Sequence, residues 1–145
     1  TVPMNRKQYE GKSTLVKTLQ EYWGVMSDVA TICKFPMIPP RPLKPGLLVE
    51  LLNAVTGWDL TIGDFLTTGE RIFNLARMFN VREGMTRKDD QLPQRLEEVL
   101  KEGGSAGESY PKHELEKLLD EYYQLRGWTA DGIPMPETLK RLGLD

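Results

Sequence analysis

The sequence predicts an all-α protein, an irregular domain of about five to seven helices with long Pro-rich and Gly-rich connections. Apolar residues recur every three to four positions along several stretches, a spacing that keeps one face of a helix dry. Proline and glycine separate these stretches. No stretch alternates apolar and polar residues convincingly, and no repeat of the length used by solenoids is visible. The 145 residues are therefore expected to form a single helical domain.

The first expected helix covers residues 12–30, with Gly24 as a bend. Its apolar stripe consists of Leu15, Leu19, Tyr22, Met26 and Ala30. Residues 36–45 follow and hold five of the ten prolines. Because proline lacks a backbone N–H and clashes with helical geometry, this segment is predicted to be an extended, semi-rigid connection.

Two further helices are expected in the middle of the chain. A short one carries Leu48, Leu51, Leu52 and Val55 and ends before Gly57, the usual residue just beyond a last helical turn. Thr61 or Asp59 then caps the best helix, which runs to about residue 80. Its predicted apolar stripe is Ile62, Phe65, Leu66, Ile72, Phe73, Ala76 and Phe79. The polar residues predicted to lie mostly off that stripe are Asp64, Thr67, Glu70, Arg71, Asn74 and Arg77.

The last third of the chain contains the remaining elements. A short helix is expected within residues 92–101, before a Gly/Ser-rich surface loop at residues 103–107. Pro111 behind Ser109 has the position of a first-turn proline. The helix that follows is marked by Leu115, Leu118, Leu119, Tyr122 and Arg126. A final helix is predicted from Pro136 to Leu142, with Gly143 after it.

Composition excludes several classes of function. The net charge is −2 and the pI about 5.5, so no positive field attracts nucleic acid or anionic lipid. No apolar run approaches the roughly 18 residues that a membrane helix needs, and no secretory signal is visible. A single cysteine rules out an internal disulfide framework and fits a reducing compartment, which favours a cytoplasmic location.

Several motif-like features have ordinary structural interpretations. Gly11-Lys12-Ser13 is similar to the end of a phosphate-binding loop, but Arg6 stands where the first glycine should be and no strand precedes it. It is interpreted as a helix start. His113, the only histidine, is interpreted as a solvated helix residue. The paired acids Asp89-Asp90, Glu97-Glu98 and Asp120-Glu121 are interpreted as salt-bridged surface. From the residues alone, Cys33 is expected to be a buried small hydrophobe.

A specific resemblance changes the interpretation of Cys33. Residues 9–35 contain Asp28 and Cys33 at the spacing D-x-x-G-[LI]-C, followed by the basic Lys34 and by Phe35. Residues 51–93 and 119–144 continue the match in order, so that it covers nearly the whole chain. These stretches resemble the tungstopterin aldehyde:ferredoxin oxidoreductase family. One departure is Thr31, which stands where the family has a glycine that lets the backbone approach a cofactor.

The resemblance implies a set of roles. The intact enzymes of the family have a β-rich first domain and two helical domains, with a tungsten bis-pterin beside a four-iron four-sulfur cluster. Cys33 would be the fourth cluster ligand, and Asp28, Ile32 and Lys34 would contact the pterin. These residue types suit the task, since a thiolate is the standard iron ligand and a carboxylate accepts hydrogen bonds from pterin N–H groups. No catalytic residue is assigned to this chain.

Two classes of function follow. In the first, the chain is the carboxy-terminal part of a larger oxidoreductase that converts an aldehyde and water to a carboxylic acid and passes electrons to ferredoxin. Its partners are then the remainder of the parent enzyme, ferredoxin and a small aldehyde. In the alternative, it is a stand-alone, non-catalytic helical interaction module. Thr1 looks like a cut in mid-sequence and the final residues like a natural terminus.

The isolated chain is expected to behave differently from the parent. Alone, it is expected to bind neither the cluster nor tungsten, because a four-iron cluster commonly needs four cysteines and the chain has one. The exposed face around Asp28, Ile32 and Cys33 is expected to drive a homo-oligomer.

Overall fold

Five α-helices make up most of the part of the chain that the computed structural model describes, namely residue 5 and residues 7–35 and 44–145. The prediction of an all-α fold is confirmed. Within those residues, β pairing is limited to one isolated bridge between Trp128 and Pro134. None of the described helices has the length and apolar character needed to cross a membrane. The helices are α1 (Lys12–Trp23), α2 (Pro45–Thr56), α3 (Ile62–Arg82), α4 (Lys112–Arg126) and α5 (Pro136–Leu142).

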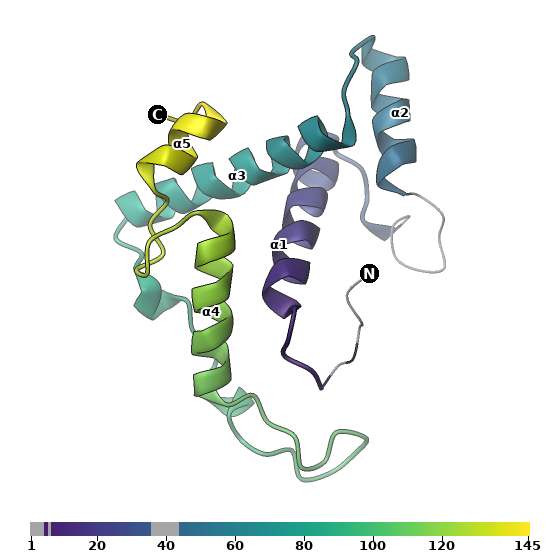
Figure 1. Cartoon of the computed structure of the whole chain (residues 1–145). Coiled ribbons are helices and arrows are strands. Elements are labelled where there is room, and N and C mark those ends of the chain that lie inside the picture. The colour runs from purple at the N-terminus through teal and green to yellow at the C-terminus, as the bar shows by residue number, and fades with distance from the viewer. Residues whose placement is uncertain (1–4, 6, 36–43) are drawn as a thin grey trace.

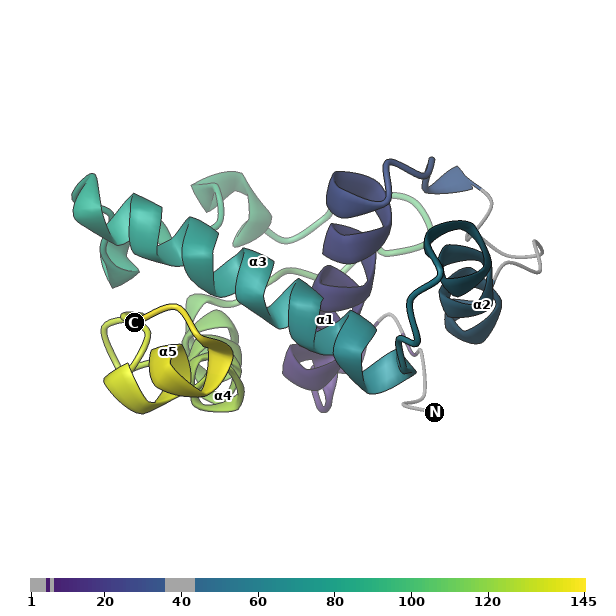
Figure 2. The ribbon, with the colours of Figure 1, turned by 90° about the horizontal axis from the view of Figure 1, so that it is seen from above.

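Helix α3 is the longest element and organises the others. It runs across the molecule, with α1 and α4 beside each other on one side of it (Figure 1). Viewed from above, α5 lies along the carboxy-terminal half of α3, while α2 stands at its amino-terminal end (Figure 2). The fold therefore has two halves, one around α1, α2 and the start of α3, the other around α4, α5 and the end of α3.

Helix α1 begins at Lys12, directly after Gly11, whose φ of 75° is left-handed. The interpretation of Gly11-Lys12-Ser13 as a helix start is therefore confirmed. The Ser13 hydroxyl is buried and donates a hydrogen bond to the carbonyl oxygen of Leu118 at 2.9 Å. This serine therefore fixes α1 against α4.

The helical path continues beyond α1 in a different form. The α-helix ends at Trp23, and Gly24–Val29 form a π-helix, which holds more residues per turn. The bend predicted at Gly24 is thus a change of helix type. A Cβ atom at Gly24 would lie 3.1 Å from a ring carbon of Phe73, so the glycine allows this turn to pack closely against α3.

Helix α2 begins earlier than the sequence suggested. Pro45, expected to end the extended connection, is instead the first residue of the helix. Its missing N–H costs nothing there, because first-turn N–H groups have no helical partner. The remainder of the Pro-rich segment, residues 36–43, lies outside the described residues. Gly57, with φ 74°, ends α2 as predicted.

The amino terminus of α3 carries a complete capping box. The Thr61 hydroxyl accepts a hydrogen bond from the Asp64 N–H at 3.1 Å, and the Asp64 carboxylate accepts one from the Thr61 N–H at 2.9 Å. The Thr61 hydroxyl also donates to the Asp64 carboxylate at 2.6 Å, and this hydrogen bond, together with the one from the Thr61 N–H, holds the pKa of Asp64 below its usual value. Thr61, rather than Asp59, is therefore the cap, since both partners are satisfied reciprocally.

The buried face of α3 differs from the predicted stripe. Phe65 is buried, but Ile62 and Phe79, at the two ends of the stripe, are exposed. Asn74 and Arg77, predicted to lie off the stripe, are buried. The prediction is therefore wrong for these four residues, while Leu66 and Ile72 do pack against the core. The second half of α3 differs because it faces buried polar groups rather than an apolar core.

The connection between α3 and α4 is mostly irregular. The helix expected within residues 92–101 is reduced to one 3₁₀ turn at Gln94–Leu96, and another such turn covers Arg87–Asp89. Residues 103–107 form turns, as predicted for a loop. Pro111 precedes the first turn of α4 rather than lying in it. Helix α5 covers the predicted residues, and Gly143 ends it with φ 62°.

The hydrophobic core lies in the first half of the fold. It is made from α1, the π-helix, α2 and α3, and consists of Tyr22, Val25, Met26, Leu48, Val49 and Phe65. Glycine makes one contact in this half possible. Gly69 of α3 lies so close to the Glu21 backbone of α1 that a Cβ atom would collide with it. The two helices therefore cross at backbone contact distance.

Candidate functional site

The residues that the resemblance singles out lie on one short segment, residues 28–34, which begins at the end of the π-helix and continues beyond it. Backbone hydrogen bonds fix its path. The N–H of Ala30 donates to the Val25 oxygen at 2.8 Å, and the N–H of Ile32 donates to the Met26 oxygen at 2.9 Å. Because Val25 and Met26 are buried in the core, the segment is attached directly to the hydrophobic core.

Thr31 has a left-handed backbone with φ 54°, the only non-glycine residue with positive φ among the described residues. It follows Ala30, the cap of the π-helix, and so has the position at which helices usually end in a glycine. The turn that Thr31 makes brings the Ile32 N–H back onto the π-helix. A glycine is expected at this position because the turn requires a positive φ. Threonine adopts the same turn with some conformational strain.

The segment presents its polar side chains to solvent. Asp28 is exposed, and its carboxylate accepts a hydrogen bond from the Ser27 hydroxyl at 2.7 Å. Cys33 is a free, exposed thiol, so its interpretation as a buried hydrophobe is wrong. The Lys34 ammonium lies 5.8 Å from the centre of the Trp23 ring. Asp28, Cys33 and Lys34 are thus all available to a group bound outside the chain.

Ile32 differs from its neighbours. Its side chain is half-buried and packs against the core cluster. The expected open apolar face around Ile32 is therefore present only in part. The side chain anchors the segment, while its neighbours on both sides remain exposed.

A buried charged cluster holds the end of α1 that leads into this segment. Arg126 of α4 is fully buried and donates to Glu21 at 2.9 Å, to Gln20 at 2.8 Å and to the Tyr122 hydroxyl at 2.9 Å. Lys17 pairs with Glu21 from the other side at 2.7 Å. In the sequence, Arg126 follows the apolar residues that mark its helix at the same helical spacing, and a charge at such a position is the signal that predicts a buried polar cluster.

A second cluster joins the end of α3 to the carboxy-terminal turns. Arg77 makes a bidentate pair with Asp90, at 2.7 and 3.0 Å, and donates to the Gly132 oxygen at 2.7 Å. Burial and a hydrogen bond to Asp90 raise the pKa of Tyr123. Asp90 is therefore salt-bridged as predicted, but it is half-buried rather than at the open surface, whereas Asp120 pairs with Arg87 at the surface, at 2.7 Å.

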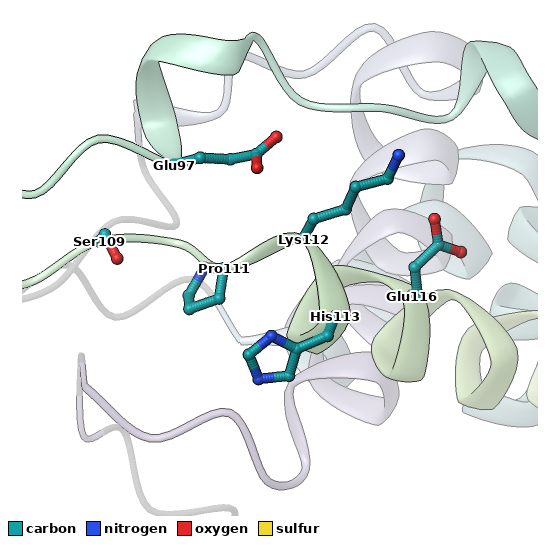
Figure 3. A pocket seen from close by; sticks show the side chains of 6 residues that line it. All are labelled: Glu97, Ser109, Pro111, Lys112, His113 and Glu116. Carbon is teal, nitrogen blue, oxygen red and sulfur yellow. The ribbon is translucent and has the colours of Figure 1, made fainter.

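A surface depression lies at the start of α4. Figure 3 shows the residues that line it: Glu97, Ser109, Pro111, Lys112, His113 and Glu116. The side chain of His113 is 69% exposed, and its Nε2 atom lies 3.2 Å from a carboxylate oxygen of Glu114. This exposure agrees with its interpretation as a solvated helix residue. Within the described part of the chain, no three histidine, cysteine or acidic side chains group in a way that could hold a metal ion.

Comparison with known families defines the class of this helical scaffold. The family described as aldehyde ferredoxin oxidoreductase, domains 2 and 3, matches residues 1–144. The chain belongs to this family.

Individual relatives agree with that assignment. The tungsten-containing aldehyde ferredoxin oxidoreductase of Pyrococcus horikoshii is 46% identical over 136 residues, which cover 92% of this chain and 21% of the relative. The WOR-like subunit of the aliphatic sulfonate oxidoreductase of Pyrococcus furiosus is 32% identical over 125 residues, or 81% of this chain and 19% of the relative. The chain thus spans about a fifth of the length of these curated relatives.

A solved structure has the same helical arrangement. The active site complex BamBC of benzoyl coenzyme A reductase contains a chain that matches with a TM-score of 0.76 and 29% identity. The match covers 99% of this chain and 20% of that one. In that structure too, the fold occurs as part of a much longer polypeptide.

Proposed function

We propose that this chain supplies one wall of the cofactor site of an aldehyde ferredoxin oxidoreductase, at residues 28–34. The observation that carries the proposal is the way the segment is presented. Its backbone is hydrogen-bonded to two core residues, while the Cys33 thiol and the Asp28 carboxylate, five positions apart in the sequence, are both exposed. Fixed ligands on a rigid support are what a buried cofactor requires.

The residues present fit part of such a site. The Cys33 thiolate would be one iron ligand of a four-iron four-sulfur cluster. The Asp28 carboxylate would accept hydrogen bonds from pterin N–H groups, and the Ser27 hydroxyl already orients it. Lys34 would place a positive charge beside the anionic cofactor, and Ile32 would hold the backbone between these side chains.

The chain would be one contributor among several. Its sequence contains one cysteine, so the other cluster ligands would come from residues outside it. When bound, the tungsten bis-pterin supplies the oxidation of an aldehyde and water to a carboxylic acid, with two protons and two electrons released. The part played by residues 28–34 is to bind, to orient and to keep the two cofactors close enough for electrons to leave toward ferredoxin.

The test is metal analysis of the complete enzyme that includes this chain. Cys33→Ser is expected to lower iron more than tungsten, because the thiolate binds iron. Asp28→Ala is expected to lower tungsten and pterin while iron stays largely bound. Asp59→Ala, another exposed aspartate, is the matched control and should leave both metals unchanged.

Full iron and full tungsten in both variants would refute the proposal. That result would favour the alternative function, a helical interaction module that keeps the fold without taking part in the chemistry.

A further inference from the structure

Helix α2 has two apolar faces, of which only one is covered by the described residues. Leu48 and Val49 are buried in the core, and Leu52 packs against it. On the adjacent face of the helix, Leu47, Leu51 and Val55 recur every four residues, and Trp58 follows just beyond the helix. We call these four residues the α2 stripe. All four are at least 44% exposed, and Val55 is 86% exposed.

The stripe is a continuous surface rather than scattered exposed residues. Positions four apart lie above one another on a helix, so the three aliphatic side chains form one row. The only charged residue of α2 is Glu50. Single exposed apolar side chains are ordinary, but a row of this kind that ends in a tryptophan is typical of an interaction site.

The stripe is also close to the segment that is proposed to face the cofactors. Residues 32–35 lie near the amino-terminal end of α2 in both views (Figures 1 and 2). Ile32 and Leu52 pack against the same core cluster. Whatever polypeptide brings the other cluster ligands to Cys33 would therefore lie beside α2 as well.

We infer that the α2 stripe is a permanent interface, covered by the part of the oxidoreductase that lies outside these 145 residues. The inference rests on the proposed function. In the relatives and in the solved structure, the matching region makes up only about a fifth of the polypeptide, so the rest is present to cover it. The chemistry fits a permanent contact, because obligate interfaces are apolar and depleted of charge. A transient carrier such as ferredoxin is expected to use charged groups instead.

The experiment is oxidative footprinting of Trp58 by hydroxyl radicals, in the complete enzyme and in this chain alone. Trp58 is 62% exposed in the chain, whereas the core residue Trp128 is 7% exposed. Burial of Trp58 to the level of Trp128 would slow its oxidation by roughly ninefold in the complete enzyme, since the rate follows exposure. An equal rate in both samples would overturn the inference.

A matched pair of substitutions supplies the second measurement. Val55→Asp in the complete enzyme is expected to restore oxidation of Trp58 and to lower the thermal midpoint. Val99→Asp, at a valine that is 58% exposed and far from α2 in sequence, should do neither. If Val55→Asp prevents assembly, the footprint of the wild-type enzyme still tests whether Trp58 is covered.

Two further outcomes are distinguishable. If Trp58 is protected in the isolated chain as its concentration rises, with a dimer in sedimentation, the occupant is a second copy and the inference is wrong. Iron content of Cys33→Ser is independent of the footprint. Protected Trp58 with undiminished iron would refute the proposed function alone, and exposed Trp58 with iron lost would refute this inference alone.

Discussion

Replacing Thr31 with glycine should stabilise the chain, although it removes a side chain. A non-glycine residue in the left-handed region is strained by roughly 1–2 kcal/mol relative to the ordinary helical region, and glycine removes this strain. Glycine also loses more backbone freedom on folding, which offsets roughly 0.5–1 kcal/mol of the stabilisation. With φ at 54° in Thr31, the centres of these two ranges give a net gain of about 0.75 kcal/mol in the free energy of unfolding.

Thermal unfolding followed by circular dichroism measures this gain. A gain of that size corresponds to an increase of about 1–4 °C in the midpoint for a chain of this length. Thr14→Gly, in the exposed part of α1, is the matched control. There the backbone is helical, so the same replacement should lower the midpoint slightly. Thr31→Asn should resemble Thr31→Gly, since asparagine tolerates the left-handed region. If Thr31→Gly destabilises the chain as Thr14→Gly does, the conformational explanation of this position is wrong.

Three further predictions concern the scaffold. Arg126→Met should lower the free energy of unfolding by about 3–5 kcal/mol in chemical denaturation, because it leaves the buried Glu21 without this partner. Adding Glu21→Gln to this variant should restore part of the lost stability. Gly69→Ala should destabilise the chain strongly in thermal unfolding, because its Cβ would collide with the backbone of α1. The lowered pKa of Asp64 stabilises the fold fully above the unfolded value of 3.8, and this contribution is lost as the pH falls through the lower folded value. Asp64→Asn should therefore reduce the fall in the free energy of unfolding at acid pH. An unchanged dependence on pH would refute the attribution of this fall to Asp64.

Local signals in the sequence predicted the helix ends well. Gly57 and Gly143 end their helices as expected, and Thr61 begins α3 with the capping box its chemistry favours. These features depend on a few neighbouring residues, so they can be read without knowledge of the fold. Pro45 was misassigned because a proline can equally end a loop or start a helix.

The buried polar residues could not be predicted in the same way. Asn74 accepts a hydrogen bond from the Trp128 ring at 2.8 Å, and Arg77 pairs with Asp90. Both partners are distant in sequence, so periodicity along α3 contains no information about them. Polar residues were therefore assigned to the surface of α3, where most polar residues lie.

For the candidate site, the resemblance supplied the positions, and the structure supplied the geometry. That Cys33 is exposed while Ile32 is half-buried follows from the turn at Thr31 and from the π-helix before it. Residue spacing alone had suggested a regular helix through residue 30. The first residue of the π-helix, Gly24, packs closely against Phe73, a contact between distant parts of the sequence that residue spacing does not contain.

The π-helix at Gly24–Val29 makes the length of this part of the chain critical during evolution. A π-turn holds about one residue more than an α-turn, so loss of a single residue would restore a regular α-helix. Each side chain after the deletion would then rotate by about 100° around the helix axis. Asp28 and Cys33 would then point in new directions, and Ile32 would lose its place against the core. Insertions and deletions should accordingly accumulate in the irregular connection between α3 and α4, and be absent from these six residues.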